Sequence, residues 1–348
     1  MKKKTSCVAF LAHNIRWVII GLLLVIALCV KSKYAQEIFV QLFLWAGLGC
    51  SWNLNCGYSK RNSIGHAAFF GIGAYATALL YTRSAISPWI GMLVGALLCG
   101  LFAWGMGRLT LKLRGTFFTL TTIAFAEVVR ILSVSLKGLT GGSQGIVINF
   151  NPSFLNMTWA SKRPYIILCF IYMLVMLIAC VKLERSRFGY QLIAVGEDTM
   201  AAEMLGVNSS SVMTKSFVMS AVTTAMGGAI YTMYYLYIEP DSVFGMNEIS
   251  LEFVLICLIG GMGLSFGPIL GALILIPVSN ILRAEFSAIS GLHGCLYGLI
   301  MLLVVLARPD GLLGLFGSLY QKALVKLGID SPPEGMAVNT GEEAEETC

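Results

Sequence analysis

Apolar residues fall along this chain in blocks of roughly twenty, and short stretches with charged, glycine or proline residues separate the blocks. A helix of about 20 residues covers the roughly 30 Å of hydrocarbon in a bilayer, so each block predicts a membrane-spanning helix. Residues 18–30 and 165–181 are apolar almost without interruption, which excludes the alternating pattern of membrane β-strands. We predict an all-α fold, a polytopic membrane helical bundle of about 10 transmembrane helices surrounded by lipid. The expected spans lie near residues 15–30, 37–55, 64–82, 88–107, 116–136, 164–183, 212–238, 250–263, 267–282 and 293–307.

The composition excludes a soluble protein. Hydrophobic residues make up 57% of the 348 residues and charged residues only 12%, whereas soluble domains carry about 25% charged residues. The net charge of +6 hides two unlike parts. The chain after Leu327 holds six acidic residues and no basic one, and the rest holds all 24 basic residues against 12 acidic ones. We therefore predict a membrane domain at residues 1–328 and an acidic, disordered cytoplasmic tail at 329–348.

The basic residues predict the orientation of the bundle. With the N-terminus in the cytoplasm, 16 of the 24 basic residues fall inside and seven outside, and Arg130 lies within a span. Lysine and arginine are enriched in cytoplasmic loops, so the chain is predicted to be N-in and C-in, with an even number of crossings. The membrane thereby explains the positive charge, and no nucleic-acid partner is predicted. Lys33 stands where a signal-peptide cleavage site needs a small residue, so an uncleaved first span is expected.

Two local motifs match enzyme patterns, and both fail on their context. Residues 71–76 (GIGAYA) fit a dinucleotide-binding pattern but lie inside an apolar helix with no strand before it. Residues 141–145 (GGSQG) fit the nucleophile elbow of serine hydrolases, yet no strand leads into Ser143 and only His293 follows as a possible base. No Walker sequence occurs, so ATP hydrolysis would need another subunit. The cysteines lack paired spacing and histidines number three, so neither disulfides nor a metal site is predicted.

Small residues recur at helix-packing intervals in several spans, where they let helix backbones approach closely. One set follows a single face of the third span, and three shorter sets repeat the pattern. Packing of a compact bundle is the favoured interpretation. The sets are Ala67, Gly71, Ala74 and Ala78; Gly91 and Gly95; Ala221, Ala225 and Ala229; and Gly267 and Gly271.

Polar and glycine-rich stretches interrupt the apolar pattern at residues 53–66, 138–145 and 260–268. Non-helical backbone is tolerated at membrane depth only inside protein or beside water, and interrupted helices line many transport pathways. We therefore predict broken or re-entrant segments here, and a tight turn is the alternative for each. The candidate pathway residues are Asn53, Asn55, Gly57, Ser63, Gly65, His66, Thr140, Gly141 and Gly142.

Glu127 and Arg130 stand at positions i and i+3 of one predicted span, close enough to pair. Ionisable side chains at membrane depth are costly and usually face a bundle interior or water. A structural ion pair is the favoured interpretation, and Glu127 is also kept among the candidate pathway residues.

The longest predicted cytoplasmic connection, at about residues 184–211, contains the signals of a short capped helix. Asp198 can accept hydrogen bonds at the N-terminus of a helix that runs to Met204 or Leu205, and Gly206 can end it. Exposed acids and small residues on such a helix suit docking against a partner, and a solvated connector is the alternative. The candidate docking residues are Glu197, Asp198, Ala201, Ala202, Glu203 and Gly206.

Five stretches in order resemble a known family, the permease subunits of branched-chain amino-acid ABC importers and, among them, the LivM-like branch. They are residues 53–75 (NLNCGYSKRNSIGHAAFFGIGAY), 139–146 (LTGGSQGI), 186–207 (SRFGYQLIAVGEDTMAAEMLGV), 239–241 with 258–272 (LIGGMGLSFGPILGA), and 297–314 (YGLIMLLVVLARPDGLLG). The resemblance implies a transport subunit rather than an enzyme, paired with a homologous second permease. It also implies an external solute-binding protein and two ATPase subunits, which bind the ATP and magnesium.

The same resemblance implies further properties of the chain. It implies the bacterial cytoplasmic (inner) membrane, an amino acid as substrate, and no cofactor in this chain. It makes residues 197–206 the segment that couples to the ATPases. The chain departs from the family in two places: Lys60 and Arg61 stand where an uncharged pair is common, and Gly196 stands where a basic residue is common.

Two alternatives to an importer of leucine, isoleucine and valine stay open. Related permeases carry urea or short amides, so the cargo could differ within the same architecture. A stand-alone secondary transporter or channel, with Glu127 and Arg130 as proton or ion sites, is the alternative from another class. The candidate pathway holds few fixed charges for a zwitterion, so we expect substrate selection to lie mainly in the binding protein.

Overall fold

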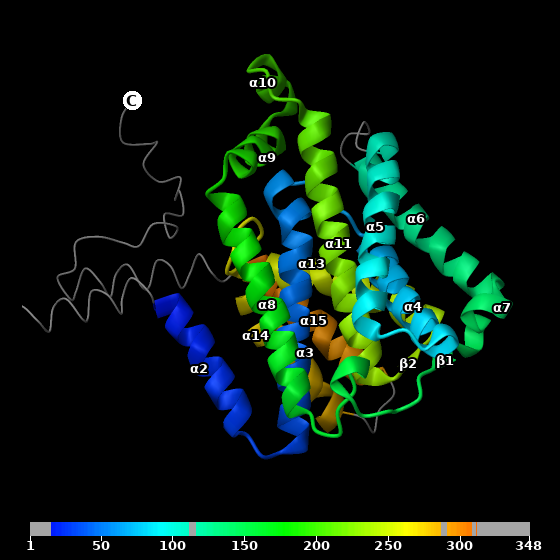
Figure 1. Ribbon diagram of the computed structural model, residues 1–348. Coiled ribbons are helices and arrows are strands. Elements are labelled where there is room, and N and C mark those ends of the chain that lie inside the picture. The colour runs from blue at the N-terminus through cyan, green and yellow to red at the C-terminus, as the bar shows by residue number, and fades with distance from the viewer. Residues whose placement is uncertain (1–14, 111–115, 287–290, 308–310, 312–348) are drawn as a thin grey trace, which may run out of the picture.

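The computed structural model describes residues 15–110, 116–286, 291–307 and 311, and helices dominate it (Figure 1). Lys2, Lys3 and Lys4 and the predicted tail at 329–348 lie outside these residues. The long helices are α2 (Ile15–Cys29), α3 (Lys33–Trp52), α4 (His66–Ser84), α5 (Pro88–Thr110), α6 (Thr116–Ser135), α8 (Arg163–Glu184), α9 (Arg187–Glu197), α11 (Ser209–Tyr235), α13 (Leu251–Gly260), α14 (Gly267–Glu285) and α15 (Leu292–Ala307). The short elements are η1 (Asn53–Gly57), α7 (Lys137–Thr140), η2 (Gly142–Gln144), β1 (Ile146–Val147), η3 (Phe154–Asn156), α10 (Thr199–Met204), β2 (Tyr237–Ile238), α12 (Pro240–Phe244) and η4 (Met246–Ser250).

Every predicted span coincides with one of the long helices, to within a few residues at each end. The agreement follows from the apolar runs, since backbone polar groups in hydrocarbon have to bond within their own segment. Four of the described helices, α5, α6, α8 and α14, are each long and apolar enough to cross a membrane. The all-α fold is confirmed, and these four helices agree with a polytopic membrane bundle. Ten crossings with both termini inside stay a prediction.

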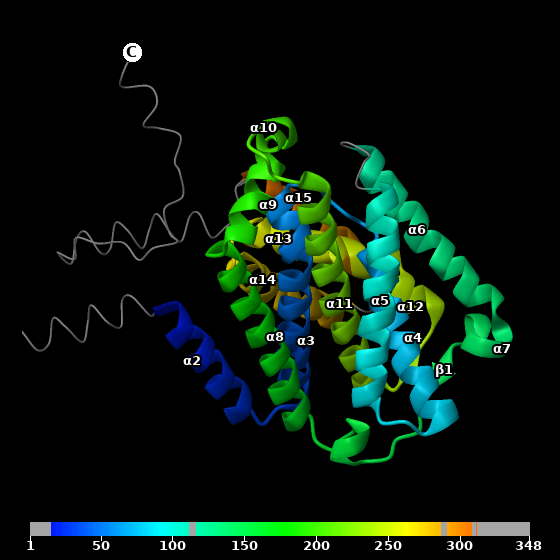
Figure 2. The same ribbon diagram turned by 45° about the horizontal axis from the view of Figure 1, so that its top comes forward.

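Helices α3 and α11 form the centre of the bundle (Figure 2). Helices α8 and α14 pack on α3, and α4 and α5 pack on α11. The side chains of Phe43 and Trp52 on α3 and of Phe217 on α11 are fully buried. By contrast, Leu97 and Leu101 on α5 are 66% and 61% exposed, an arrangement that suits an apolar surrounding.

Small residues bring helix backbones into direct contact, both within the predicted sets and at further glycines. Within the sets, a side chain on Gly271 of α14 would strike the Ile256 carbonyl of α13. A side chain on Gly73 of α4 would strike the Ala225 carbonyl of α11, and one on Gly228 of α11 would strike the Phe70 carbonyl. A side chain on Gly71 would meet the ring of Phe244. The dinucleotide-like motif at residues 71–76 therefore serves helix packing.

The segment after α6 is fastened to the end of α11. Strand β1 pairs antiparallel with β2, and Ile146 lies opposite Ile238. Gly145 has φ +69° and lies against the Ile238 carbonyl, where a side chain would not fit. This end of the bundle lies opposite α10, as the two ribbon views agree (Figures 1 and 2).

Candidate functional site

The first predicted interruption begins as a continuation of α3. Residues Asn53–Gly57 form the π-helical turn η1, and such turns occur often at functional sites. The Asn53 side chain is buried; its Oδ1 accepts a hydrogen bond from Gly263 N at 3.0 Å, and its Nδ2 donates to Leu264 O at 3.1 Å. A side chain on Gly57 would strike the Asn53 amide, so this bridge needs a glycine there. One asparagine thus joins the first and third interruptions.

His66 completes the first interruption as a buried member of a hydrogen-bond chain. Ser220 Oγ donates to Ser51 O at 2.7 Å, so its 2.8 Å contact with His66 Nε2 requires that nitrogen to be the donor. His66 Nδ1 then accepts from Ser63 Oγ at 3.1 Å. Both ring nitrogens are satisfied in the neutral form, and the chain links α3, α4 and α11.

Asn55 and Gly65, two further predicted pathway residues, are also enclosed by the chain. The Asn55 side chain is 2% exposed, and its Nδ2 contacts Cys56 Sγ at 3.6 Å. The start of α4 lies against α6 at Gly65, so closely that a side chain there would strike the Thr122 carbonyl. In this conformation the polar side chains at Asn53, Asn55, Ser63 and His66 have no exposure above 2%.

Glu184, the last residue of α8, connects the first and third interruptions a second time. Its Oε1 accepts hydrogen bonds from Tyr58 Oη at 3.0 Å and from Ser265 N at 2.8 Å. A carboxylate oxygen with two donors is well satisfied, and charge-assisted bonds are the stronger kind. We call Asn53, Tyr58, Glu184 and residues 261–266 the junction. It ties together the ends of α3, α8, α13 and α14.

Helix α9, which the sequence analysis did not predict, runs from α8 to the junction. Ser186 begins it by accepting a hydrogen bond from Gly189 N at 3.0 Å, and a serine before an apolar periodic run was the available signal. At the far end, a side chain on Gly196 would lie 2.8 Å from Tyr58 O, so α9 packs directly on the backbone after η1. Beside this contact, Lys60 Nζ pairs with Glu197 Oε1 at 2.6 Å. Both side chains are exposed, so the pair contributes under about 1 kcal/mol.

Helix α10 confirms the predicted capped helix in the long connection. Asp198 Oδ1 accepts hydrogen bonds from Met200 N at 2.8 Å and from Ala201 N at 3.1 Å. At the other end Gly206 has φ +83°, and its N–H donates to Glu203 O at 2.9 Å, as in a helix stop with glycine at C′. α10 projects from one end of the bundle (Figure 1).

The surface of α10 is more apolar than the sequence analysis expected. Ala202 faces inward and is only 3% exposed, whereas Ala201 and Glu203 are exposed. Met204 and Leu205, at the C-terminal end of the helix, are 86% and 85% exposed. Two large apolar side chains in the open at one helix end are typical of a protein contact. The sequence analysis did not predict Met204 and Leu205 as contact residues, because it treated them only as the end of the helix.

The other predicted pathway residues lie at the opposite end of the bundle. Arg130 Nη2 pairs with Glu127 Oε1 at 2.6 Å within α6, and Arg130 Nη1 pairs with Asp241 Oδ1 of α12 at 2.5 Å. This geometry fits the favoured interpretation of a structural ion pair. The arginine thereby fastens α6 to the segment after β2.

Thr140, Gly141 and Gly142 form the corner after α6. Thr140 Oγ1 donates to Ser133 O and Leu136 O at 2.5 and 2.9 Å, and the two glycines have φ +76° and +61°. The structure therefore brings the residue 53–66 and 197–206 sets together at one end and leaves Glu127 and residues 140–142 at the other.

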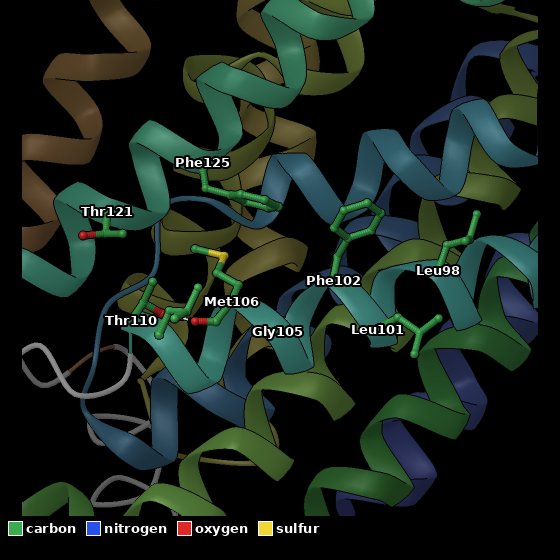
Figure 3. A pocket seen from close by; sticks show the side chains of 9 residues that line it. Leu98, Leu101, Phe102, Gly105, Met106, Thr110, Thr121 and Phe125 are labelled. Carbon is green, nitrogen blue, oxygen red and sulfur yellow. Dashed lines mark hydrogen bonds between the residues drawn. The ribbon is translucent and has the colours of Figure 1, made fainter.

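An apolar cleft lies between α5 and α6, with a volume of about 650 Å³ (Figure 3). Phe102 and Met106 of α5 and Phe125 of α6 point into it, and the lining contains no charged side chain. No predicted site residue lies there. Such a lining suits contact with hydrocarbon.

For a metal site, no group of three or more His, Cys, Asp or Glu side chains gathers within the ranges that the structure describes.

Comparison with known proteins decides the family. Residues 34–305, which contain the junction, α9 and α10, match the family described as branched-chain amino acid transport system / permease component. The chain belongs to this family. No solved structure matches the chain.

Individual relatives of this permease fall into three groups. It is 29% identical to the high-affinity branched-chain amino acid transport system permease protein LivM of Salmonella typhimurium, over 84% of this chain and 73% of that one. It is 24% identical to LivH of the same organism, over 72% of this chain and 84% of that one. It is also 28% identical to the nucleoside ABC transporter permease protein NupC of Lactococcus lactis, over 50% of this chain and 60% of that one.

Proposed function

We propose that this chain is the LivM-type permease subunit of an ABC importer that carries leucine, isoleucine and valine across a bacterial inner membrane. The similarity to LivM over most of the chain supports this proposal above all. The proposed partners are a homologous LivH-type permease, two ATPase subunits that bind ATP and magnesium, and an external binding protein. Ten crossings with both termini inside belong to the same proposal, which gives the chain no cofactor of its own and no enzymatic activity.

In this proposal, the ATPase subunits act on the permease at α10. Closure of the ATPase pair pushes on Met204, Leu205 and the capped turn that begins at Asp198. The force passes along α9 to Gly196, which lies on the backbone of residues 58–59. From there the hydrogen bonds of Asn53 and Glu184 carry it to α3, α13 and α14. The bundle then rocks against the second permease, and access alternates between the two sides of the membrane.

The predicted pathway residues take two roles in this scheme. Asn53, Asn55, Gly57, Ser63, Gly65 and His66 lie inside the moving element, where buried hydrogen bonds keep the helices in register. Glu127, Thr140, Gly141 and Gly142 lie at the end where a solute would arrive from the binding protein. We propose that the first set transmits the motion and the second shapes the entrance.

The coupling role of α10 is tested with two matched leucine variants. Leu205→Arg places a charge on the 85% exposed surface of α10, and Leu155→Arg does the same at a 67% exposed position of η3 at the opposite end. The expected result is that Leu205→Arg loses leucine uptake at least about tenfold and no longer co-purifies the ATPases. Leu155→Arg keeps the ATPases. Retention of both ATPases and full uptake in Leu205→Arg would contradict the coupling role.

The cargo is tested in the same reconstituted importer. Unlabelled isoleucine and valine should compete with leucine uptake, whereas urea and uridine should not. Uridine is included because of the similarity to NupC. Competition by urea or uridine alone would replace the amino-acid assignment with that solute. Flux through the single chain, driven by an ion gradient without ATPases, would favour the stand-alone transporter instead.

A further inference from the structure

A polar cavity of about 360 Å³ lies at the end of the bundle where α11 and α14 finish. Helices α3, α11, α13, α14 and α15 contribute to its wall, together with residues of α12 and η4. Gln41 of α3 lies in this wall, 12 residues before Asn53, which is about 18 Å along a helix. The cavity is therefore separate from the junction and contains none of the predicted site residues.

Three charged side chains line this cavity: Arg283, at the exposed end of α14, Glu252 of α13 and Glu248 of η4. None of them forms an ion pair with any residue of the described ranges. The Glu252 carboxylate accepts hydrogen bonds from Tyr297 Oη at 3.2 and 3.1 Å, which fixes its position. Ionisable groups at membrane depth usually pair with one another or serve the passage of a solute. Opposite charges attract, but Arg283 and Glu252 lie too far apart to form an ion pair.

Neutral polar groups hold the rest of the wall in place. Asn280 Nδ2 donates to Gln41 Oε1 at 2.8 Å, and Gln41 Nε2 donates to Tyr235 Oη at 2.9 Å. This chain of bonds joins α14, α3 and α11. Because these neutral groups bond to each other, the groups left for a ligand are the charged ones: Arg283, the single basic residue of the wall, and the two acidic residues Glu252 and Glu248.

The wall also has an apolar part. Trp45 of α3, Ile249 of η4 and Ile276 of α14 line the same cavity. A ligand that carries both charges at one end and a hydrocarbon group at the other would satisfy all of these groups. A free amino acid with an apolar side chain has that chemistry.

We propose that this cavity is a binding site for a zwitterionic, apolar amino acid within the permease itself. Arg283 binds the carboxylate, Glu252 binds the ammonium group, and Trp45 and Ile276 contact the side chain. The proposal rests on the proposed function and adds a second selection step after the binding protein. It departs from the expectation that substrate selection lies mainly in the binding protein because the candidate pathway holds few fixed charges for a zwitterion.

The site is tested by protection of a cysteine in the cavity wall. Ser279→Cys, which lines the cavity, is labelled with a thiol reagent in the complete reconstituted importer without ATP, in a background free of other reactive cysteines. L-leucine should slow the labelling. Leucinamide, which lacks the carboxylate, and 4-methylvalerate, which lacks the ammonium group, should need roughly tenfold or higher concentrations. Leu155→Cys, outside the cavity, should not be protected by any of them.

Charge variants link each ligand group to its residue. In Arg283→Gln, the half-protecting concentration of leucine should rise at least about tenfold and approach that of leucinamide. In Glu252→Gln, the half-protecting concentration of leucine should approach the half-protecting concentration of 4-methylvalerate. The exposed Arg163→Gln and Glu285→Gln are the matched controls and should behave like the unmodified chain.

The outcomes separate this inference from the proposed function. Leucine uptake with no protection at position 279, or with equal protection in Arg283→Gln and the unmodified chain, would overturn the cavity site alone. Absence of amino-acid uptake in the unmodified importer would overturn the proposed function. Protection that distinguishes leucine from its two analogues, and that Arg283→Gln weakens at least about tenfold, supports both.

Discussion

The junction and the cavity differ in how completely the chain satisfies their polar groups. At the junction, Asn53 and Glu184 are satisfied by partners within the chain, at distances of 2.8 to 3.1 Å. At the cavity, the Glu252 carboxylate has one donor, Tyr297 Oη, and Arg283 has no ionic partner among the described residues. Groups that satisfy one another make a rigid connection, whereas a charge without an ionic partner keeps a capacity to bind. The difference separates a part that transmits force from a part that receives a solute.

The first prediction breaks the junction and has the largest expected effect. Asn53→Leu removes the hydrogen-bond partner of two partly buried groups, Gly263 N and Leu264 O, and an unsatisfied buried group costs about 1 to 3 kcal/mol. The free energy of unfolding should fall by roughly 2 to 4 kcal/mol, measured by denaturant titration of the purified protein in detergent. Asn55→Leu is the matched control, since the single hydrogen bond of the Asn55 side chain within the described residues goes to Cys56 Sγ, and it should lose much less. Equal losses in the two variants would mean that the bridge carries no special stability.

The second prediction weakens the junction without removing its geometry. Glu184→Gln keeps an oxygen that can accept from Tyr58 and Ser265 but removes the charge from both bonds. Charge-assisted bonds are about twice as strong as neutral ones, so the free energy of unfolding should fall by about 1 kcal/mol. Glu285→Gln, at the exposed end of α14, should change it by less than about 0.5 kcal/mol. A loss in Glu285→Gln as large as in Glu184→Gln would point to net charge as the cause.

The third prediction concerns the cavity and has the smallest effect on stability. Arg283 holds no ion pair within the described part of the chain, so Arg283→Gln should leave the free energy of unfolding within about 0.5 kcal/mol of the unmodified protein. The half-protecting concentration of leucine in the cavity should nevertheless rise at least about tenfold. A thermal-denaturation series with Arg163→Gln as control measures the change in stability. Strong destabilisation by Arg283→Gln alone would show that this arginine supports the fold, and the contrast between the junction and the cavity would disappear.

The features that could be predicted from the sequence are those that depend on residues close together in the chain, such as helix positions and helix caps. Apolar runs located the long helices, because a bilayer sets the length that a helix needs. The cap at Asp198 and the stop at Gly206 were predictable because capping groups act on N–H and C=O groups a few residues away. The partner of Asn53 was not, since Gly263 lies 210 residues further along the chain.

The residues of the cavity escaped prediction for a similar reason. Gln41, Glu252 and Arg283 lie on three different helices, and each looks like an ordinary polar residue near the end of its own span. Only the packing of α3, α13 and α14 brings them to one cavity. The interruption at residues 53–66 was located correctly, but its first turn is π-helical and continues α3.

The contact at Gly196 has a consequence for chimeric permeases. The end of α9 touches the backbone of Tyr58 and Ser59, and any larger residue at position 196 would lift the helix from that surface. The next residue, Lys60, has φ +53° and pairs with Glu197. We therefore expect residues 58–60 and the loop from Ser186 to Gly206 to be exchangeable between permeases only together. A loop taken alone from a relative with a basic residue at position 196 would arrive without the surface that fits it.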